Sequence, residues 1–405
     1  MSAPRILAVA SAVELDYHYG CTPAWWQLWK GLYEAGVDLI VTPYRGRAVE
    51  SPWWRTYENP CRREGEAFAA VRSAAARLRG DRLLRRAESH PADTASDRAA
   101  RALIHRWVTP RWRAHLERIV ERERVDAVIV FTVPMSHVRG VPSSLRERFG
   151  IPVVFYDGDV PMSLPEYGGM DTGFNPYHGA DPAEYDAVLS NSEGGLERLR
   201  ELGARRAEAL LWAADPELFA PLPVEKEVDV FFYGYGSKFR REWIRELLAE
   251  PSVRLAEVDF AVGGGDFGRG ELGRARELGW IPFNAFSRAI SASRISLNIT
   301  RRPHATVPGS SSARPFELAA AGAAIVSGPH AGIEQWFEPE RELLLVSNAD
   351  EAVDAYRALL ADPGLAEELG RRARERILDE HTYVHRARRL LELIGLAPER
   401  VATHA

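Results

Sequence analysis

The feature that most constrains this chain is a series of short apolar runs that alternate with helical patterns and then starts again. In the first half the apolar runs lie at Ile6–Ala10, Asp38–Thr42, Ala127–Phe131, Pro152–Tyr156 and Ala187–Ser190. Helical patterns follow several of them, at Pro23–Ala35, Ser143–Phe149 and Glu193–Leu202. Runs that are apolar throughout are typical of strands buried on both faces of a parallel sheet. The alternation therefore predicts the βαβ units of a doubly wound α/β domain.

The second half repeats the pattern. We expect strands at Asp229–Tyr233, Leu255–Val262, Ile295–Ile299, Ala324–Ser327 and Leu343–Val346. Helices are expected at Arg240–Ala249, Pro315–Ala321 and Ala349–Leu360, and throughout Pro363–Leu396. Residues 219–226 are flanked by prolines and resemble a linker. We therefore predict an N-terminal Rossmann-like domain over 1–220, a C-terminal one over 221–380, and a terminal helical segment over 381–405.

Residues 62–123 interrupt the alternation of the first half. They are rich in Arg, Ala and Glu, with Trp107 and Trp112 near their end. We interpret them as an insertion of helices. Their arginines predict a solvated helix face, and the alternative is a cover over an acceptor site.

Bulk properties exclude several classes of protein. The formal net charge of −5 over 405 residues gives no electrostatic reason to expect a nucleic acid or an anionic membrane as a partner. No stretch approaches 18 uncharged apolar residues, so no membrane span is expected. The N-terminal apolar run is too short for a signal peptide, and Cys21 and Cys61 lack metal-ligand spacing. We therefore expect a cytoplasmic protein with reduced thiols.

A serine-rich segment before a predicted helix is the first candidate site. Ser310-Ser-Ser-Ala-Arg314-Pro-Phe-Glu317 leads into the helix and then to Gly322. Backbone N–H groups at such a helix start bind anions, and an arginine adds a fork that suits phosphate. Glu317, one turn in, is placed to accept hydrogen bonds from a vicinal diol such as that of a ribose. The alternative is that the serines cap the helix and Glu317 complements its dipole.

A glycine turn with basic residues is the second candidate. Gly234 and Gly236 end a predicted strand, and Lys238 and Arg240 open the helix that follows. Glycine permits close backbone approach, and cations at a helix start oppose the macrodipole unless an anion binds between them. The alternative is that these side chains point into solvent.

A glycine-rich segment in the second half resembles a cofactor-binding motif. Residues 263–268 match the glycine spacing of a dinucleotide fingerprint, but residues 280–295 lack the acidic residue that should follow. We therefore do not expect a nicotinamide or flavin cofactor.

Asp157 and Asp159 form a D-x-D triplet after a predicted strand, which fits a metal site, a polar loop or a catalytic carboxylate. His137 follows the preceding strand, and His18 and Tyr19 follow the first.

Taken in order, these blocks resemble GT-B glycosyltransferases of the glycogen-phosphorylase-like type. The closest likeness is to the glycosyl-transferase-1-like group that includes the CgeB proteins and family 4. The resemblance rests on 151–157, 185–192, 212–219, the basic turn around Lys238, 279–282, Arg314–Gly322 and 381–383. The sequence departs from family 4 at one position that bears on the identity of the donor sugar. Family 4 members carry two glutamates separated by seven residues; Glu317 matches the second, and Gly309 stands where the first would be.

The resemblance implies two facing Rossmann-like domains with an interdomain cleft and a C-terminal helix that crosses back. It implies a glycosyltransferase, and a hexosyltransferase in particular, that uses a nucleotide-diphosphate sugar as donor without a further cofactor or a metal. The alternatives are a nucleotide-sugar epimerase and a non-catalytic nucleotide-binding protein. The sequence names neither the sugar, the base, the acceptor nor the stereochemistry.

The candidate residues then take the following roles. Lys238, Arg240, Arg314 and the amides near Ser311 and Ser312 hold the diphosphate, beside Gly234 and Gly236. Glu317 holds the ribose next to Phe316, and Pro282 belongs to a loop that reads the base. Lys238 and Arg314 stabilise the leaving group, and Asp157 is the catalytic carboxylate. The acceptor residues are His18, Tyr19, His137 and Asp159.

Overall fold

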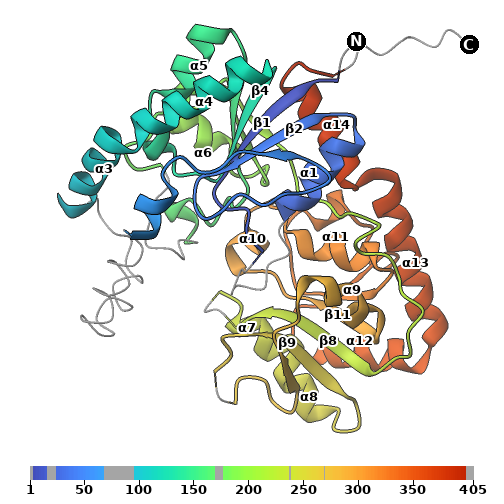
Figure 1. Cartoon of the computed structure of the whole chain (residues 1–405). Coiled ribbons are helices and arrows are strands. Elements are labelled where there is room, and N and C mark those ends of the chain that lie inside the picture. The colour runs from blue at the N-terminus through green and yellow to red at the C-terminus, as the bar shows by residue number, and fades with distance from the viewer. Residues whose placement is uncertain are drawn as a thin grey trace, which may run out of the picture. The chain divides into compact units, whose positions relative to one another are not determined.

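The computed structural model describes residues 3–15, 24–67, 95–168, 177–236, 239–268 and 270–397. The chain divides into two compact units (Figure 1). Unit 1 comprises residues 1–15, 32–210 and 387–405, and unit 2 comprises residues 16–31 and 211–386. Two helices contribute to both units: α1 (Ala24–Glu34) and α14 (Tyr383–Leu393). The C-terminal helix that was predicted to cross back is thereby confirmed.

Unit 1 is built on a parallel sheet whose described strands have the order β3-β2-β1-β4-β5-β6-β7. The strands are β1 (Arg5–Ala10), β2 (Asp38–Pro43), β3 (Arg55–Thr56), β4 (Ala127–Phe131), β5 (Val153–Asp157), β6 (Ala187–Ser190) and β7 (Ala207–Ala209). The five predicted strands are all present. The chain order reverses between β1 and β4, which makes this pair the topological switch point of the sheet.

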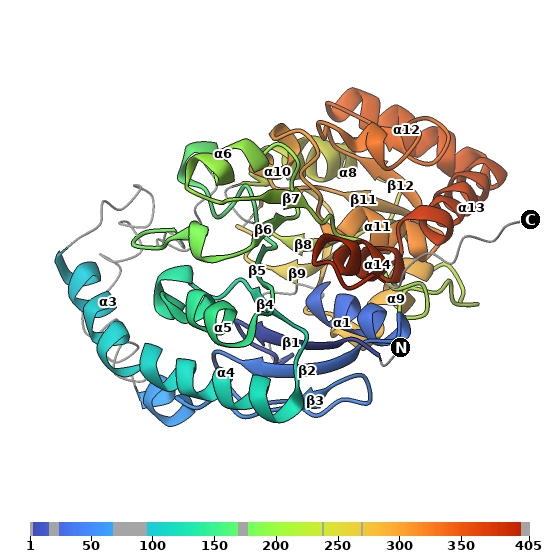
Figure 2. The same ribbon diagram turned by 90° about the horizontal axis from the view of Figure 1, so that it is seen from above.

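The helices of unit 1 correct the interpretation of residues 62–123. The helices are α3 (Ala95–Trp107), α4 (Thr109–Glu123), α5 (Val141–Phe149) and α6 (Leu196–Glu201), with short 3₁₀ turns at Met135–Val138, Pro165–Tyr167 and Pro182–Glu184. In Figures 1 and 2, α4 and α5 lie side by side. Helix α4 buries Trp112, Leu116 and Ile119 in the core cluster of unit 1, while Arg111 and Arg118 are exposed. On α4 the predicted solvated arginine face is confirmed, whereas residues 68–94 of this segment lie outside the described residues; α4 itself lies on the crossover that returns the chain from β3 to β4.

Unit 2 is built on a second parallel sheet, with the described order β10-β9-β8-β11-β12-β13. The strands are β8 (Val228–Tyr235), β9 (Phe260–Gly265), β10 (Arg276–Gly279), β11 (Ser293–Asn298), β12 (Ala324–Ser327) and β13 (Leu344–Leu345). Its switch point lies between β8 and β11. The strand predicted at Leu255–Val262 starts later, at Phe260, because the preceding helix continues to Arg254 and Leu255 ends it.

Helices cover both faces of the unit 2 sheet. They are α7 (Arg241–Ile244), a π-helical turn (Arg245–Ala249), α8 (Glu250–Arg254), α9 (Phe283–Ser291), α10 (Arg302–Thr306), α11 (Ala313–Ala320), α12 (Ala349–Ala361) and α13 (Pro363–Glu380), with a 3₁₀ turn at Ile333–Gln335. Side chains of β8 alternate between two separate core clusters. Phe231 and Tyr233 belong to one cluster, and Val230 and Phe232 to the other. This period of two is expected for a strand buried on both faces.

The proline-flanked segment 219–226 lies inside unit 2. The backbone N–H of Leu222 donates to Ser291 Oγ at 3.0 Å, and Lys226 Nζ donates to the carbonyls of Ser291 and Ser293 at 2.9 and 2.7 Å. The change of unit along the chain falls earlier, between Leu210 and Leu211. The prolines thus indicate that regular structure is absent here, without marking the change of unit. Within the described residues, no helix is both long and apolar enough to cross a membrane.

Candidate functional site

The start of α11 combines a serine, an arginine and a glutamate, as the sequence predicted. Ser312 is the N-cap residue, with extended backbone angles, and Arg314 and Glu317 lie within the first turns of the helix. The Ser312 hydroxyl makes no capping hydrogen bond. Among the described residues, neither Ser312 Oγ nor Arg314 Nη1 has a hydrogen-bond partner, although both atoms are buried. Buried polar atoms without partners are rare in folded proteins, and they call for an explanation.

Two aromatic rings and a carboxylate hold the Arg314 guanidinium. Its central carbon lies 4.2 Å from the ring centre of Phe286 and 5.1 Å from that of Tyr233. Its Nη1 lies 3.3 Å from Glu317 Oε2, an ion pair without hydrogen-bond geometry. Cation–π contacts fix a planar guanidinium without using its N–H groups. The arrangement therefore presents an oriented cation at the start of α11.

Glu317 is almost completely buried, with an exposed fraction of 1%. Its Oε1 accepts a hydrogen bond from Gln27 Nε2 at 3.2 Å, and its Oε2 faces Arg314. The carboxylate is thus oriented by residues of unit 2 on two sides.

The neighbouring residues Ser311 and Phe316 serve the structure of unit 2. Ser311 Oγ accepts a hydrogen bond from the backbone N–H of Trp212 at 2.9 Å. Phe316 is fully buried and its ring packs against Trp336, Phe337 and His381. Its ring is therefore part of the core, below the polar start of the helix.

The carboxyl ends of β8 and β11 meet at the switch point of unit 2. Arg240 joins them, because its guanidinium donates to the carbonyls of Ile299 at 2.9 Å and Tyr235 at 3.4 Å. A Cβ on Gly236 would lie 2.5 Å from the carbonyl oxygen of Asp266, and one on Gly234 would lie 2.7 Å from the Phe232 ring. The close approach that these glycines permit is thus, in part, to protein atoms. Lys238 lies outside the described residues.

A second arginine follows β11, and a buried histidine holds it. Arg301 Nη2 lies 2.9 Å from His304 Nε2, and His304 Nδ1 lies 2.9 Å from Ser310 Oγ. A guanidinium only donates, so His304 Nε2 must accept and Nδ1 must carry the proton that it donates to Ser310. This relay connects the end of β11 to the serine segment before α11.

The predicted base-reading loop adjoins this cluster. Pro282 is the N-cap residue of α9, and the carbonyl of Ile281 accepts a hydrogen bond from the Tyr233 hydroxyl at 3.0 Å. Trp280 in the same loop is 47% exposed. Tyr233 therefore contacts both this loop and Arg314, which lies over its ring.

In unit 1, Asp157 at the end of β5 is buried in a polar network. Its Oδ2 accepts hydrogen bonds from Ser163 Oγ and Tyr177 Oη, both at 2.6 Å, and its Oδ1 accepts from the backbone N–H of Asp159 at 3.0 Å. Burial raises the pKa of this carboxyl above its ordinary value, although the three hydrogen bonds oppose the shift. Asp157 therefore orders the segment that carries Asp159, which is itself half-buried.

His137 lies at the same edge of the unit 1 sheet, after β4. Its Nδ1 is 2.9 Å from the Tyr44 hydroxyl, and Tyr44 follows β2. Burial, together with the charge of Arg45, lowers the pKa of His137 from 6.5 to about 4. The imidazole is therefore neutral near pH 7. His18 and Tyr19, the other predicted acceptor residues, lie outside the described residues.

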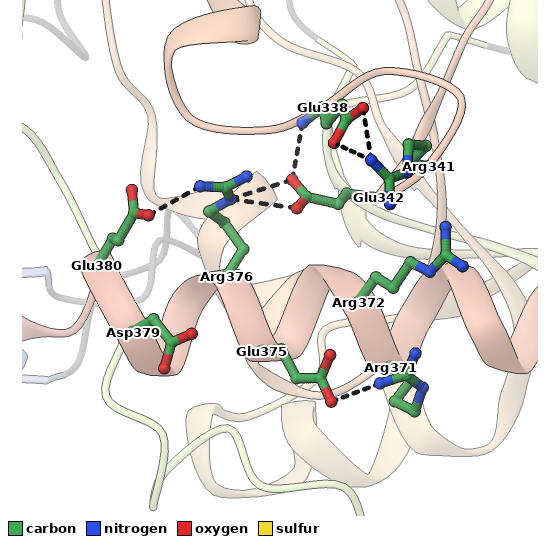
Figure 3. A pocket seen from close by; sticks show the side chains of 9 residues that line it. All are labelled: Glu338, Arg341, Glu342, Arg371, Arg372, Glu375, Arg376, Asp379 and Glu380. Atoms are coloured by element: carbon green, nitrogen blue, oxygen red, sulfur yellow. Dashed lines mark hydrogen bonds and ion pairs between the residues drawn. The ribbon is translucent and has the colours of Figure 1, made fainter.

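A charged hollow of about 470 Å³ lies beside α13, and none of the residues that line it is a predicted site residue (Figure 3). Its acidic and basic side chains pair with one another: Arg341 with Glu338 at 2.9 Å, and Arg376 with Glu342 at 3.1 Å. The Arg341–Glu338 pair is solvent-exposed, and such pairs stabilise a fold weakly, whereas Glu342 is buried. In the described part of the chain, no three His, Cys, Asp or Glu side chains are grouped as metal ligands would be.

Comparison with known proteins gives a family match to part of the chain and a set of similar folds. Residues 240–392 match the model of a family described as glycosyl transferase-like. No curated protein sequence matches the chain. The fold resembles sucrose-phosphate synthase from Thermosynechococcus elongatus, with a TM-score of 0.63 at 16% identity over 96% of this chain and 98% of that one.

Two other similar structures contain uridine nucleotides. HepE from Anabaena in complex with UDP-glucose has a TM-score of 0.59 at 12% identity, over 96% of this chain and 99% of that one. An E. coli trehalose-6-phosphate structure bound with UDP-2-fluoro glucose has a TM-score of 0.61 at 12% identity, over 96% and 98%. With its two Rossmann-like units, the chain has the GT-B fold that the resemblance of its sequence implied, and residues 240–392 match a glycosyl transferase-like family.

The sequence analysis did not identify three residues of the candidate site in unit 2, namely Arg301, His304 and Gln27. Arg301 and His304 have the i, i+3 spacing that could have indicated them, next to a predicted strand end. Gln27 could not be found in this way, because 290 positions separate it from Glu317.

Proposed function

We propose that this protein is a glycosyltransferase that moves a sugar, a hexose in particular, from a nucleotide-diphosphate donor held by unit 2. The observation that carries the proposal is the start of α11. Ser312 Oγ and Arg314 Nη1 are buried there without a hydrogen-bond partner among the described residues, beside backbone N–H groups that an α-helix leaves unpaired. A diphosphate would satisfy all of these donors at once.

The residues of unit 2 then divide the donor among them. Arg314 and the amides after Ser312 bind the diphosphate, and their fixed positive charge stabilises the negative charge that develops on the leaving group. Arg301, oriented by His304, and Arg240 lie at the ends of β11 and β8, where open parallel sheets bind ligands. We keep Lys238 as a further proposed contact.

Glu317 is proposed to accept hydrogen bonds from the ribose hydroxyls. Its carboxylate is held by Gln27 and Arg314, so it is fixed in place before the nucleotide binds. The loop that ends at Pro282, with the exposed Trp280, is proposed to contact the base. The uridine nucleotides in HepE and in the E. coli structure make uridine the first base to test.

For the acceptor we propose contacts at the carboxyl edge of the unit 1 sheet. Asp159 and His137 lie there, and Asp157 supports the segment that carries Asp159 through its hydrogen bond to the Asp159 N–H. In this proposal Asp159 contacts the acceptor. Asp157 acts on the acceptor only by holding the segment that carries Asp159.

The test is a binding screen followed by a turnover assay. UDP, ADP and GDP, with their glucose conjugates, are added to the whole chain while the unfolding temperature is recorded. A ligand at 100 times its Kd should stabilise the protein by about 2.7 kcal/mol. Release of the nucleoside diphosphate from the matching nucleotide sugar, with candidate acceptors present, then reports transfer. If none of these nucleotides stabilises the protein, the proposed function is wrong.

A further inference from the structure

Gln27 is a buried residue outside the sequence motifs that contacts the candidate site directly. It is fully buried on α1, and its side-chain amide bridges two parts of unit 2. The carbonyl Oε1 accepts a hydrogen bond from the backbone N–H of Asp215 at 2.9 Å, and Nε2 donates to Glu317 Oε1 at 3.2 Å.

The orientation of this amide is determined by its partners. The Asp215 N–H can only donate, so the atom that faces it must be the amide oxygen. The amide nitrogen must then face Glu317, whose ionised carboxylate can only accept. The reversed amide would place two donors together on one side and two acceptors together on the other. Gln27 therefore presents a fixed donor to Glu317.

Helix α1 is itself anchored on the same face. Lys30, three residues after Gln27, forms an ion pair with Asp215 Oδ2 at 2.7 Å and is buried with it. Gly31, four residues after Gln27, packs closely against α14: a Cβ there would lie 2.6 Å from the carbonyl oxygen of Tyr383. Residues three and four apart share one face of a helix. These two contacts therefore hold Gln27 in position from one turn away.

We propose that Gln27 is a positioning residue that orients the Glu317 carboxylate for the ribose hydroxyls of the donor. This inference rests on the proposed function. Without the Gln27 donor, Glu317 would keep its charge and its Arg314 partner but lose the contact that fixes its Oε1. The ribose hydroxyls would then meet a carboxylate that is held less firmly.

Discrimination between ribose and deoxyribose measures this effect. Calorimetry would give the Kd of UDP and of 2′-deoxy-UDP, with the ADP and GDP pairs in parallel. A site that hydrogen-bonds a ligand hydroxyl should prefer the ribose form by about tenfold or more, since a hydrogen bond to a charged group contributes about 1.5–3 kcal/mol. Glu317→Gln should remove most of this preference. Gln27→Met, which keeps the length of the side chain without polar atoms, should reduce it to about threefold or less.

Gln27→Glu gives a second, pH-dependent readout. At pH 8 the variant places a second carboxylate against Glu317, so the ribose preference should be lost. Two carboxylates that share a site raise the pKa of one of them. At about pH 5.5 the introduced carboxyl group, once protonated, can donate to Glu317 while its carbonyl oxygen accepts from Asp215, and the preference should return. A general packing defect would not reverse with pH in this way.

Tyr356→Phe is the matched control. It removes another buried hydrogen bond of unit 2, from Tyr356 Oη to the Leu247 carbonyl at 2.6 Å, in a different core cluster. Its ribose preference should equal that of the wild type. If Glu317→Gln loses the preference while Gln27→Met and Gln27→Glu keep it at pH 8, Gln27 does not position Glu317 and the proposed function stands. If the wild type binds UDP without preferring ribose, the ribose role of Glu317 is wrong, and the role of Gln27 with it.

Discussion

Two polar clusters, one at the carboxyl edge of each sheet, differ in how their groups are paired. In unit 1, Asp157, Ser163 and Tyr177 satisfy one another at 2.6 Å, and Tyr44 pairs with His137 at 2.9 Å. In unit 2, Ser312 Oγ and Arg314 Nη1 are buried without a hydrogen-bond partner among the described residues. A network that satisfies itself stabilises the fold, whereas donors left without acceptors cost stability that a ligand can restore. The comparison therefore supports the proposal that the anionic donor binds at the start of α11.

Asp157→Ala should have the largest effect, and it should act on stability. The substitution leaves the buried hydroxyls of Ser163 and Tyr177 without their acceptor. Removal of one partner from a buried charged network costs about 3–5 kcal/mol. Denaturant unfolding would measure the loss, and calorimetry on the remaining folded protein should show a Kd for UDP within about twofold of the wild type. A loss below about 1 kcal/mol would contradict the structural role of Asp157.

Acid should destabilise unit 1 through His137. Its pKa in the folded state is about 4, below the ordinary value of 6.5, so the unfolded chain binds the proton first as the pH falls. The contribution of the neutral histidine to stability is therefore fully present above about pH 6.5 and is lost as the pH falls towards 4. At about 1.4 kcal/mol per pH unit, the loss should reach about 3 kcal/mol.

His137→Asn is the matched variant for this pH dependence. It keeps a polar group near Nδ1 for the Tyr44 hydroxyl but cannot take up the proton. The free energy of unfolding of the variant should fall less steeply than that of the wild type between pH 6.5 and pH 4. Equal slopes in the two proteins would show that His137 is not buried as a neutral group.

Arg314→Met should weaken nucleotide binding more than it weakens the fold. Methionine keeps apolar contact with Phe286 and Tyr233 but removes the guanidinium. Loss of a hydrogen bond to a charged phosphate should reduce the affinity for UDP about tenfold to a hundredfold, or about 1.5–3 kcal/mol. Calorimetry gives the Kd, and Arg341→Met, at an exposed ion pair of the same unit, is the control. If both variants bind UDP as the wild type does, the start of α11 is not the diphosphate site.

The sequence predicted those parts of the molecule that local pattern determines. Strands that lie in an apolar run were found, including the two-residue β13, whereas the short β3 and β7 and the fully exposed β10 were not predicted. Such strands are set by pairing with neighbours and carry no periodic pattern of their own. The serine, arginine and glutamate of α11 lie within a few positions of one another, so a motif contains them.

The sequence could not predict contacts between distant segments, because no local pattern contains both partners. Gln27 meets Glu317 across 290 positions, and Tyr177 meets Asp157 across 20. The packing role of α4 was also hidden, because its arginines dominate the sequence while its buried face is narrow. The two polar clusters differ in burial and hydrogen-bond pairing, and both are properties of the folded chain.

A divalent metal should have the smallest effect of all, because it should leave the affinity for the nucleotide almost unchanged. The D-x-D triplet of Asp157 and Asp159 lies in unit 1, and Asp157 already accepts three hydrogen bonds. In unit 2 the Arg314 guanidinium and the start of α11 supply positive charge of the kind that a cation would otherwise bring to a diphosphate. We therefore predict that the Kd for UDP changes by less than about twofold between excess EDTA and millimolar Mn²⁺. Calorimetry in the two buffers, repeated with Asp159→Asn, is the measurement. A Kd that rises about tenfold in EDTA, returns with Mn²⁺ and no longer responds in Asp159→Asn would place the diphosphate on a metal held by unit 1 and reverse the assignment of the two edges.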